Sequence, residues 1–271
     1  MGGVELVVTD LDGTLWQTED EVHAETRAAL DRLLDAGMPV LVATGRRVTS
    51  TRVPLARIGH QLPAVVLNGA LGLDLATGER FHQFAFAPVD AIAVLDAWRS
   101  AGLDPCVYVD DPVLDVVISP NPSTHPGHVR MLGAGATVGD LDEVVRTKPV
   151  LQFTVIGVEH ALAVTGREAI DKTGAGEAFL DRALDYPGTA ALQIAPPGLS
   201  KWTGVVAFCR HRGLDPDRVL AIGDGPNDVE LLSRAAIAVA PSNGYPEAVR
   251  RAHHTVPPPS EGGWARLLDL L

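Results

Sequence analysis

Residues 4–14 read VELVVTDLDGT, a short apolar run that ends abruptly at two aspartates, Asp10 and Asp12. Such a run predicts a buried strand with both carboxylates at its carboxyl end. Four similar runs follow, at residues 39–43, 64–67, 219–222 and 237–240. Helical patterns separate them, such as the one that stops at Gly37. This alternation predicts an α/β fold with a doubly wound parallel sheet and helices on both faces.

The middle of the chain, residues 83–194, has a different pattern. Its predicted strands are Phe81–Phe86, Cys106–Val109, Asp115–Ile118, Leu151–Val158 and Ala190–Ala195, with helices near Val89–Ser100 and His160–Ala169. We therefore expect an α+β domain inserted into the first one. The first domain then consists of residues 1–82 and 195–271, and the linkers lie near 80–83 and 195–198.

Composition excludes several classes of protein. The 271 residues are 46% hydrophobic, which excludes a largely disordered chain, and carry a net charge of −12, which argues against a nucleic-acid partner. No apolar run is long enough to span a membrane, and the first residues lack the pattern of a secretory signal. Cys106 and Cys209 lie far apart, so neither a disulfide framework nor a zinc site is expected. These features predict a cytoplasmic protein.

Polar residues follow four of the predicted strands. They are Asp10 and Asp12, then Thr44-Gly45-Arg46, then Asn68-Gly69, and finally Asp224-Gly225-Pro226-Asn227-Asp228. Parallel strands share one direction, so these residues gather at the sheet edge where open α/β sheets bind ligands. Taken singly, each segment is also an ordinary turn or the start of a helix.

Four carboxylates would crowd this edge, from Asp10, Asp12, Asp224 and Asp228. Such crowding is unfavourable unless a cation or a proton offsets the charge. Oxygen ligands without cysteine or clustered histidine suit a hard ion. The sequence therefore predicts a Mg²⁺ site at this edge.

These segments resemble the motifs of the haloacid dehalogenase-like (HAD) phosphohydrolases. The first motif is 10–15 (DLDGTL), the second 43–46 (ATGR), the third Ser200-Lys201 and the fourth 223–228 (GDGPND). The Thr-Gly-Arg form, the Asn-Gly-Ala at 68–70 and the insertion resemble the Cof-type subgroup with a C2 cap. The resemblance covers nearly the whole chain and implies a Rossmann-like core with an inserted cap domain.

The resemblance implies a role for each acidic residue. Asp10 would be the nucleophile that forms an aspartyl-phosphate. Asp12, two residues on and on the same side of an extended backbone, would protonate the leaving group and later deprotonate water. Mg²⁺ would bind Asp10, Asp224 and the backbone carbonyl of Asp12, while Asp228 would shape the site without binding the ion.

The resemblance also implies a set of phosphate-binding residues. Thr44 and Asn68 would donate hydrogen bonds to the phosphate oxygens, and the set is completed by Gly45, Arg46 and Asn227. Arg46 could equally be an exposed residue at the start of a helix.

Lys201 would supply positive charge to Asp10 and to the phosphate. Its alternative is a solvated surface lysine, the usual fate of this residue type. That alternative is weakened because the chain has only three lysines, Lys148, Lys172 and Lys201, and keeps one here.

In the inserted domain, the polar candidates for selecting the leaving group are Asp110, Asp111, Asp115, His125 and His128. The two histidines, three residues apart, could mimic a pair of metal ligands. A solvated loop is the stronger interpretation, because no third ligand is in view. Trp202 and the segment 241–244 depart from the family pattern without removing a reacting group, and Trp202 is expected to pack within its helix.

The predicted activity is a Mg²⁺-dependent phosphatase acting on a small phosphorylated metabolite, with a sugar phosphate the first expectation. One alternative is a phosphomutase that returns the phosphoryl group to a hexose. A second alternative is a non-catalytic phospho-acceptor sensor, but such receivers are single compact domains and this chain is too long for one. The sequence leaves the substrate and the oligomeric state open.

Overall fold

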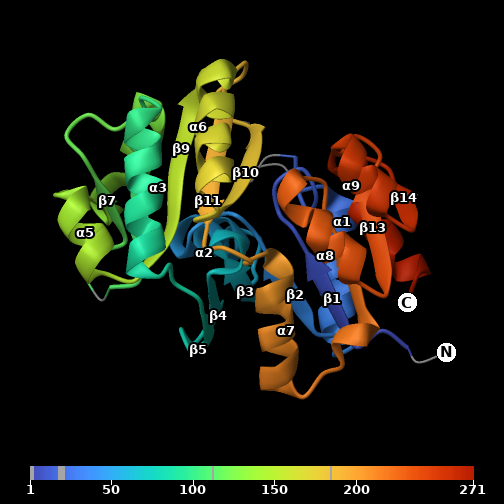
Figure 1. Ribbon diagram of the computed structural model, residues 1–271. Helices are drawn as coiled ribbons and strands as arrows, with labels where there is room; N and C mark the ends of the chain where they lie inside the picture. The colour runs from blue at the N-terminus through green and yellow to red at the C-terminus, as the bar shows by residue number, and fades with distance from the viewer. Residues whose placement is uncertain (1–2, 18–21, 112, 184) are drawn as a thin grey trace. The chain divides into compact units, whose positions relative to one another are not determined.

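The computed structural model describes residues 3–17, 22–111, 113–183 and 185–271. The chain divides into two compact units, one made of Met1–Gln83 with Ser200–Leu271 and the other of Phe84–Leu199. The first unit is thus built from both ends of the chain (Figure 1).

Among the described residues, the first unit contains one sheet of eight strands in the order β14-β13-β12-β1-β2-β3-β4-β5. The strands are β1 (Leu6–Thr9), β2 (Val40–Ala43), β3 (Pro63–Val66), β4 (Leu71–Asp74), β5 (Arg80–Gln83), β12 (Val219–Ile222), β13 (Ile237–Pro241) and β14 (His254–Val256). From β14 to β3 the neighbours are parallel, and β4 and β5 add an antiparallel hairpin. The parallel order confirms the predicted doubly wound α/β fold.

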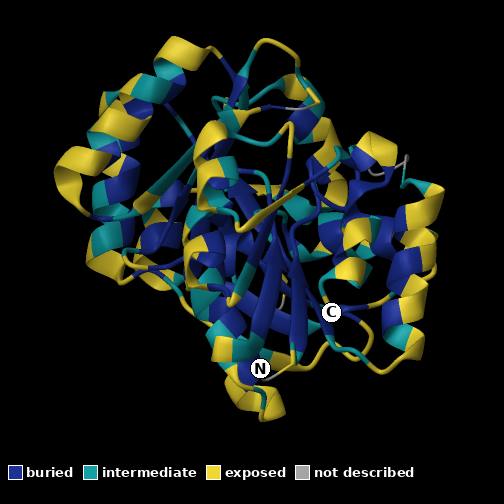
Figure 2. Ribbon diagram, turned by 90° about the vertical axis from the view of Figure 1, so that its right-hand side faces the viewer, coloured by how far each residue is buried: buried dark blue, intermediate teal, exposed yellow. Residues whose placement is uncertain are grey.

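Helices cover both faces of this sheet. They are α1 (Ala24–Asp35), α2 (Val48–Arg57), α7 (Lys201–Arg212), α8 (Val229–Arg234) and α9 (Pro246–Arg251), with a 3-10 turn η6 (Gly263–Asp269). Leu6 and Val8 of β1 pack with Phe208 of α7 on one face. On the other face the indole N–H of Trp264 donates to Thr9. The strands therefore form the buried centre that Figure 2 shows in dark blue.

One predicted strand belongs to a different sheet. The prediction placed Phe81–Phe86 in the inserted domain, but the strand is β5 and pairs with β4 in the first unit. Phe81 explains this position, because its ring packs edge-on against Phe208 of α7 with centroids 5.1 Å apart. Gly72 of β4 makes room for that ring, since a Cβ there would lie 2.3 Å from it.

The second unit is an α+β arrangement, as predicted. In its described residues one sheet has the strand order β10-β11-β9-β6-β7-β8. The strands are β6 (Cys106–Val109), β7 (Val116–Ile118), β8 (Ala136–Val138), β9 (Val150–Val158), β10 (Glu177–Arg182) and β11 (Ala190–Ala195). The helices are α3 (Pro88–Ser100), α4 (Pro126–Leu132), α5 (Leu141–Thr147) and α6 (His160–Thr173). Trp98 and Phe153 centre its apolar core.

Both cysteines are buried thiols without a disulfide. Burial raises the pKa of Cys106 to about 12 and that of Cys209 to about 11. Neither thiol therefore ionises readily, and both pack as small apolar side chains. In the described part of the chain, no helix has the length and apolar character needed to cross a lipid bilayer.

Candidate active site

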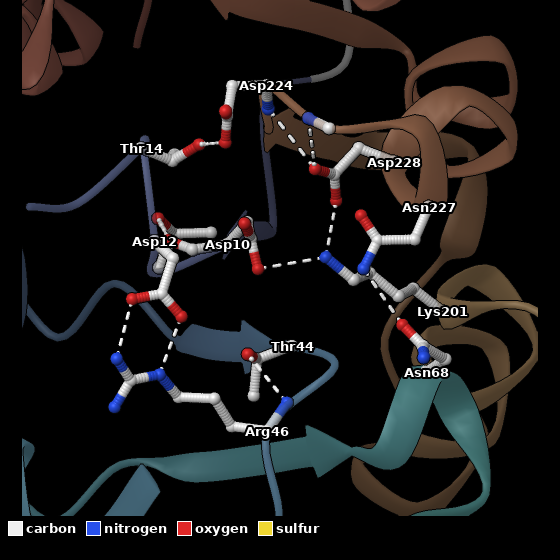
Figure 3. A network of polar contacts seen from close by, with 12 residues as sticks. Asp10, Asp12, Thr14, Thr44, Arg46, Asn68, Lys201, Asp224, Asn227 and Asp228 are labelled. Carbon is white, nitrogen blue, oxygen red and sulfur yellow. Dashed lines mark hydrogen bonds and ion pairs between the residues drawn. The ribbon is translucent and has the colours of Figure 1, made fainter. Parts of the chain in front are cut away.

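The predicted site residues of the first unit lie in loops at the carboxyl ends of its parallel strands. Asp10 follows β1, Thr44 follows β2, Asn68 lies just beyond β3 and Asp224 lies just beyond β12. Their side chains converge at one edge of the sheet, together with Lys201 from the start of α7 (Figure 3). The structure thus brings together residues that are far apart in the sequence.

Lys201 is the centre of this arrangement. It exposes none of its surface, and its Nζ atom lies 2.8 Å from Oδ1 of Asp10 and 2.7 Å from Oδ1 of Asp228. Burial alone would lower the pKa of Lys201, but the charges of Asp10 and Asp228 outweigh it and hold the pKa above the usual value. The surface-lysine alternative is therefore wrong for this residue.

The electrostatics around Asp10 favour a bound cation. Burial, together with the neighbouring charges of Asp228 and Asp224, raises the pKa of Asp10, although Lys201 opposes the shift. A cation beside the three carboxylates would offset their mutual repulsion.

Asp228 stabilises the loop after β12. Its Oδ2 atom accepts hydrogen bonds from the backbone N–H groups of Asp224 (3.1 Å) and Gly225 (2.9 Å), while Oδ1 accepts from Lys201. The preceding Gly223 leaves room for the carboxyl group, because a Cβ there would lie 2.4 Å from Cγ of Asp228. Asp228 therefore fixes both the loop and the lysine.

Asp224 is held from the other side by the loop after β1. The hydroxyl of Thr14 donates to Oδ1 of Asp224 at 2.8 Å. Gly13 adopts a φ of +76°, and a Cβ there would lie 2.3 Å from Oδ2 of Asp224. Only glycine lets this loop approach the carboxylate so closely.

The donor set fits a hard divalent ion. One carboxylate oxygen from each of Asp10, Asp224 and Asp228 lies within 4.8 Å of the others. Among the described residues this is the one group of three His, Cys, Asp or Glu side chains close enough to hold a metal. We call these three residues the carboxylate cluster. Oxygen ligands of this kind are those that Mg²⁺ prefers.

Asp12 points away from Lys201 and toward Arg46 (Figure 3). Its Oδ2 lies 2.6 Å from Nε of Arg46 and its Oδ1 lies 2.6 Å from Nη2, so the guanidinium binds both oxygens. The indole N–H of Trp16 donates to Oδ1 at 3.0 Å. The side chain of Asp12 is therefore not part of the carboxylate cluster.

Thr44, Asn68 and Asn227 come from the loops after β2, β3 and β12 (Figure 3). Thr44 and Asn68 are buried, and the side-chain amide of Asn227 donates to Oδ1 of Asn68 at 2.8 Å. Leu67 and Asn68 both have positive φ, 52° and 55°, which is uncommon for residues other than glycine. Backbone strain of this kind is concentrated at functional sites.

The polar residues predicted to select the leaving group lie in the second unit. Asp111 pairs with Lys148 at 2.7 Å, and both Asp110 and Asp115 flank the β6–β7 turn. His125 caps α4, where its Nδ1 accepts from the N–H of Gly127 at 3.0 Å, and its ring lies 4.0 Å from that of Tyr186. His128 is buried in α4, so the solvated-loop interpretation is wrong for this residue. Neither histidine belongs to a metal-binding group of three within the described residues.

Two residues that contact the predicted aspartates were not predicted from the sequence. Thr14 orients Asp224, and Trp16 orients Asp12. Both lie within four residues of a predicted aspartate, but their partners depend on the loop conformation. Trp202 is partly buried and packs against the apolar core that α7 helps to form, as expected.

A model of the haloacid dehalogenase-like hydrolase family matches residues 7–268. The chain belongs to this family. The match confirms the resemblance drawn from the four motifs and the expectation of an enzyme of the hydrolase class.

Several curated relatives of this HAD-family chain carry phosphatase names. It is 27% identical to a phosphoglycolate phosphatase of Methanopyrus kandleri, over 91% of this chain and 87% of the relative. It is 26% identical to the 5-amino-6-(5-phospho-D-ribitylamino)uracil phosphatase YitU of Bacillus subtilis, over 97% and 96%.

Solved structures confirm the fold of this HAD-family chain. The HAD phosphatase BT1666 of Bacteroides thetaiotaomicron superposes with a TM-score of 0.79 at 20% identity, covering 99% of this chain and 95% of that one. The HAD subclass IIB sugar phosphatase BT4131 gives a TM-score of 0.78 at 19% identity, covering 98% of each chain.

Proposed function

We propose that the protein is a Mg²⁺-dependent phosphatase that hydrolyses a small phosphorylated metabolite, with sugar phosphates the first class to test. The observation that carries the proposal is the position of Asp10, beside Lys201 and within the carboxylate cluster. Relatives named for phosphoglycolate and for a phosphoribityl compound support a small phosphoester as substrate.

In the first step, an oxygen of Asp10 attacks phosphorus in line with the leaving oxygen. The bond from phosphorus to Asp10 forms as the bond to the leaving oxygen breaks, giving an aspartyl-phosphate. The leaving alkoxide takes a proton from Asp12 and departs as an alcohol. Lys201 lowers the repulsion between the carboxylate and the anionic phosphate.

In the second step, water attacks phosphorus and Asp12 takes the water proton. The bond from phosphorus to Asp10 breaks, which regenerates the carboxylate and releases inorganic phosphate. Thr44, Gly45, Asn68 and Asn227 are the residues we propose to bind the phosphate oxygens. The strained backbone at Asn68 and its contact with Asn227 support a fixed orientation for that amide.

Asp10, Asp224 and the backbone carbonyl of Asp12 would hold the metal, and Asp228 would keep its loop in place. When bound, Mg²⁺ would neutralise charge on the phosphate and stabilise the transition state. The all-oxygen donor set of the carboxylate cluster supports this choice of ion.

The test is a phosphate-release screen with and without Mg²⁺. The panel contains hexose phosphates, phosphoglycolate, a phosphoribityl compound and p-nitrophenyl phosphate. We expect release only with Mg²⁺ and an abolished rate in Asp10→Asn. Asp35→Asn makes the same carboxylate-to-carboxamide substitution at an exposed position of α1, so it is the matched control and should keep the parental rate.

Three outcomes would contradict the proposal. Phosphate release by Asp10→Asn at the parental rate would remove the nucleophile assignment. A hexose phosphate converted to its isomer without phosphate release would favour the phosphomutase. A stable phospho-protein without turnover would favour the sensor.

A further inference from the structure

The carboxylate of Asp12 is held by three donors from two side chains. Arg46 binds both oxygens at 2.6 Å, and the indole N–H of Trp16 donates to Oδ1 at 3.0 Å. A two-point contact between guanidinium and carboxylate fixes the plane of the carboxylate, which a single contact would not. The orientation of Asp12 is therefore set by these two neighbours.

Arg46 is itself held in place. Its Nη1 donates to the backbone carbonyl of Ser50 in α2 at 2.9 Å, and its backbone N–H donates to Oγ1 of Thr44 at 3.2 Å. The guanidinium carbon lies 5.7 Å from the centre of the Trp16 ring, and that ring is fully buried. The start of α2 and a buried indole thus anchor the group that binds Asp12.

The two oxygens of Asp12 differ in their contacts. Within the described residues Oδ1 accepts from both Arg46 and Trp16, whereas Oδ2 accepts from Arg46 alone. A carboxylate offers about two acceptor positions on each oxygen, so Oδ2 keeps one for another partner. That oxygen is the one able to exchange a proton with a leaving group or with water.

We propose that Arg46 is a positioning residue, which together with Trp16 aims Oδ2 of Asp12 for proton transfer. The proposal rests on the proposed function, because the phosphatase reaction is the one in which Asp12 transfers a proton. It assigns Arg46 a role through Asp12 in place of the phosphate contact predicted from the sequence. Arg46 then affects both proton transfers of Asp12, to the leaving group and from water, and not the binding of phosphate.

The experiment compares two substrates. An alkyl phosphate needs a proton on its leaving oxygen, whereas p-nitrophenyl phosphate releases a stable phenolate that does not. We compare kcat/KM, which reports formation of the aspartyl-phosphate and not its hydrolysis, a step that both substrates share. In Arg46→Ala we expect kcat/KM for the alkyl phosphate to fall by about 10- to 100-fold, less than the ~10²–10⁴-fold that general acid–base catalysis supplies, because Asp12 itself is still present. With p-nitrophenyl phosphate the fall should stay below about threefold, and the inhibition constant of inorganic phosphate should not change.

A double-mutant cycle with Asp12→Asn tests whether Arg46 acts through Asp12. In the Asp12→Asn background, Arg46→Ala should change kcat/KM by less than about twofold, because the group it positions is already gone. Arg46→Lys should not rescue Arg46→Ala, because one ammonium cannot bind both oxygens in a fork. Arg27→Ala, an exposed position on α1, is the matched control and should leave both rates unchanged.

Each other outcome overturns the proposal. If Arg46→Ala weakens phosphate inhibition and slows both substrates equally, or adds its full effect to Asp12→Asn, Arg46 is a phosphate ligand. Should Arg46→Ala unfold below the assay temperature, Trp16→Phe and Arg46→Lys take its place, and an unchanged substrate ratio in both refutes the idea. A parent protein that releases no phosphate from any ester refutes the proposed function instead, before any variant is compared.

Discussion

Lys201 donates a 2.8 Å hydrogen bond to Asp10 from a position with no exposed surface. The same ammonium binds Asp228, so one buried cation serves two buried carboxylates. A buried ammonium is unfavourable unless its partners offset the lost hydration. Stability and the charge of the site therefore depend on the same three side chains.

Lys201→Met should lower both the activity and the stability. It leaves the buried carboxylates of Asp10 and Asp228 without their cation, so we expect the free energy of unfolding to fall by about 3–5 kcal/mol. Denaturant unfolding and phosphate release measure the two effects. Lys172→Met, an exposed position on α6, is the control. Parental stability in Lys201→Met would contradict the buried ion pair.

Gly13→Ala should strain the backbone and, in addition, weaken the proposed Mg²⁺ site. Its Cβ would lie 2.3 Å from Asp224, whereas Gly37 has a similar φ of +74° and nothing within 4 Å. Both alanine variants should lose about 1–2 kcal/mol from the left-handed conformation. Only Gly13→Ala should also need more Mg²⁺ for half-maximal activity. Equal Mg²⁺ requirements in the two variants would refute the role of this close approach.

Thr14→Val should weaken the metal site without changing the shape of the loop. The lost hydroxyl orients Asp224, and removal of such a supporting hydrogen bond costs about 10- to 100-fold in metal affinity. A Mg²⁺ titration of the activity measures it. Thr26→Val is the matched control, because the buried hydroxyl of Thr26 has no hydrogen-bond partner among the described residues. Its Mg²⁺ requirement should equal that of the parent.

The ion pair of Asp111 with Lys148 makes a pH-dependent contribution to the folding stability of the second unit. A hydrogen bond from Lys148, followed by those from the backbone N–H groups of Val113 and Leu114, lowers the pKa of Asp111 from 3.8 to about 2. Because the folded-state pKa is the lower one, this contribution is complete above the ordinary pKa and is lost as the pH falls toward about 2.

Lys148→Met should move the pKa of Asp111 back toward its ordinary value. An NMR titration of the carboxyl group measures the shift, and acid unfolding should then depend less on pH between about 4 and 2. An unmoved titration curve would show that the ion pair does not form in solution.

The residues at the strand ends could be predicted from the sequence, because each motif directly follows an apolar run and the carboxyl ends of parallel strands meet at one edge of the sheet. Asp10, Thr44 and Asp224 lie at the predicted edge for that reason. The contact between Asp12 and Arg46 could not be predicted, because it depends on the rotamers of two residues in different loops. Likewise, the hairpin of β4 and β5 was missed, since its attachment depends on how Phe81 packs on α7. The substrate, Mg²⁺ and the cytoplasmic location stay predictions.

The inserted arrangement of the chain also has a consequence during synthesis. On the ribosome, β1 emerges long before β12, its partner in the finished sheet, while Phe84–Leu199 emerges as one continuous segment. That segment can fold while the first unit still lacks three strands of its described sheet, β12, β13 and β14. Asp10 meets Asp224 and Lys201 only when nearly the whole chain has been made. A prematurely terminated product therefore carries Asp10, the proposed nucleophile, without Asp224 and Lys201.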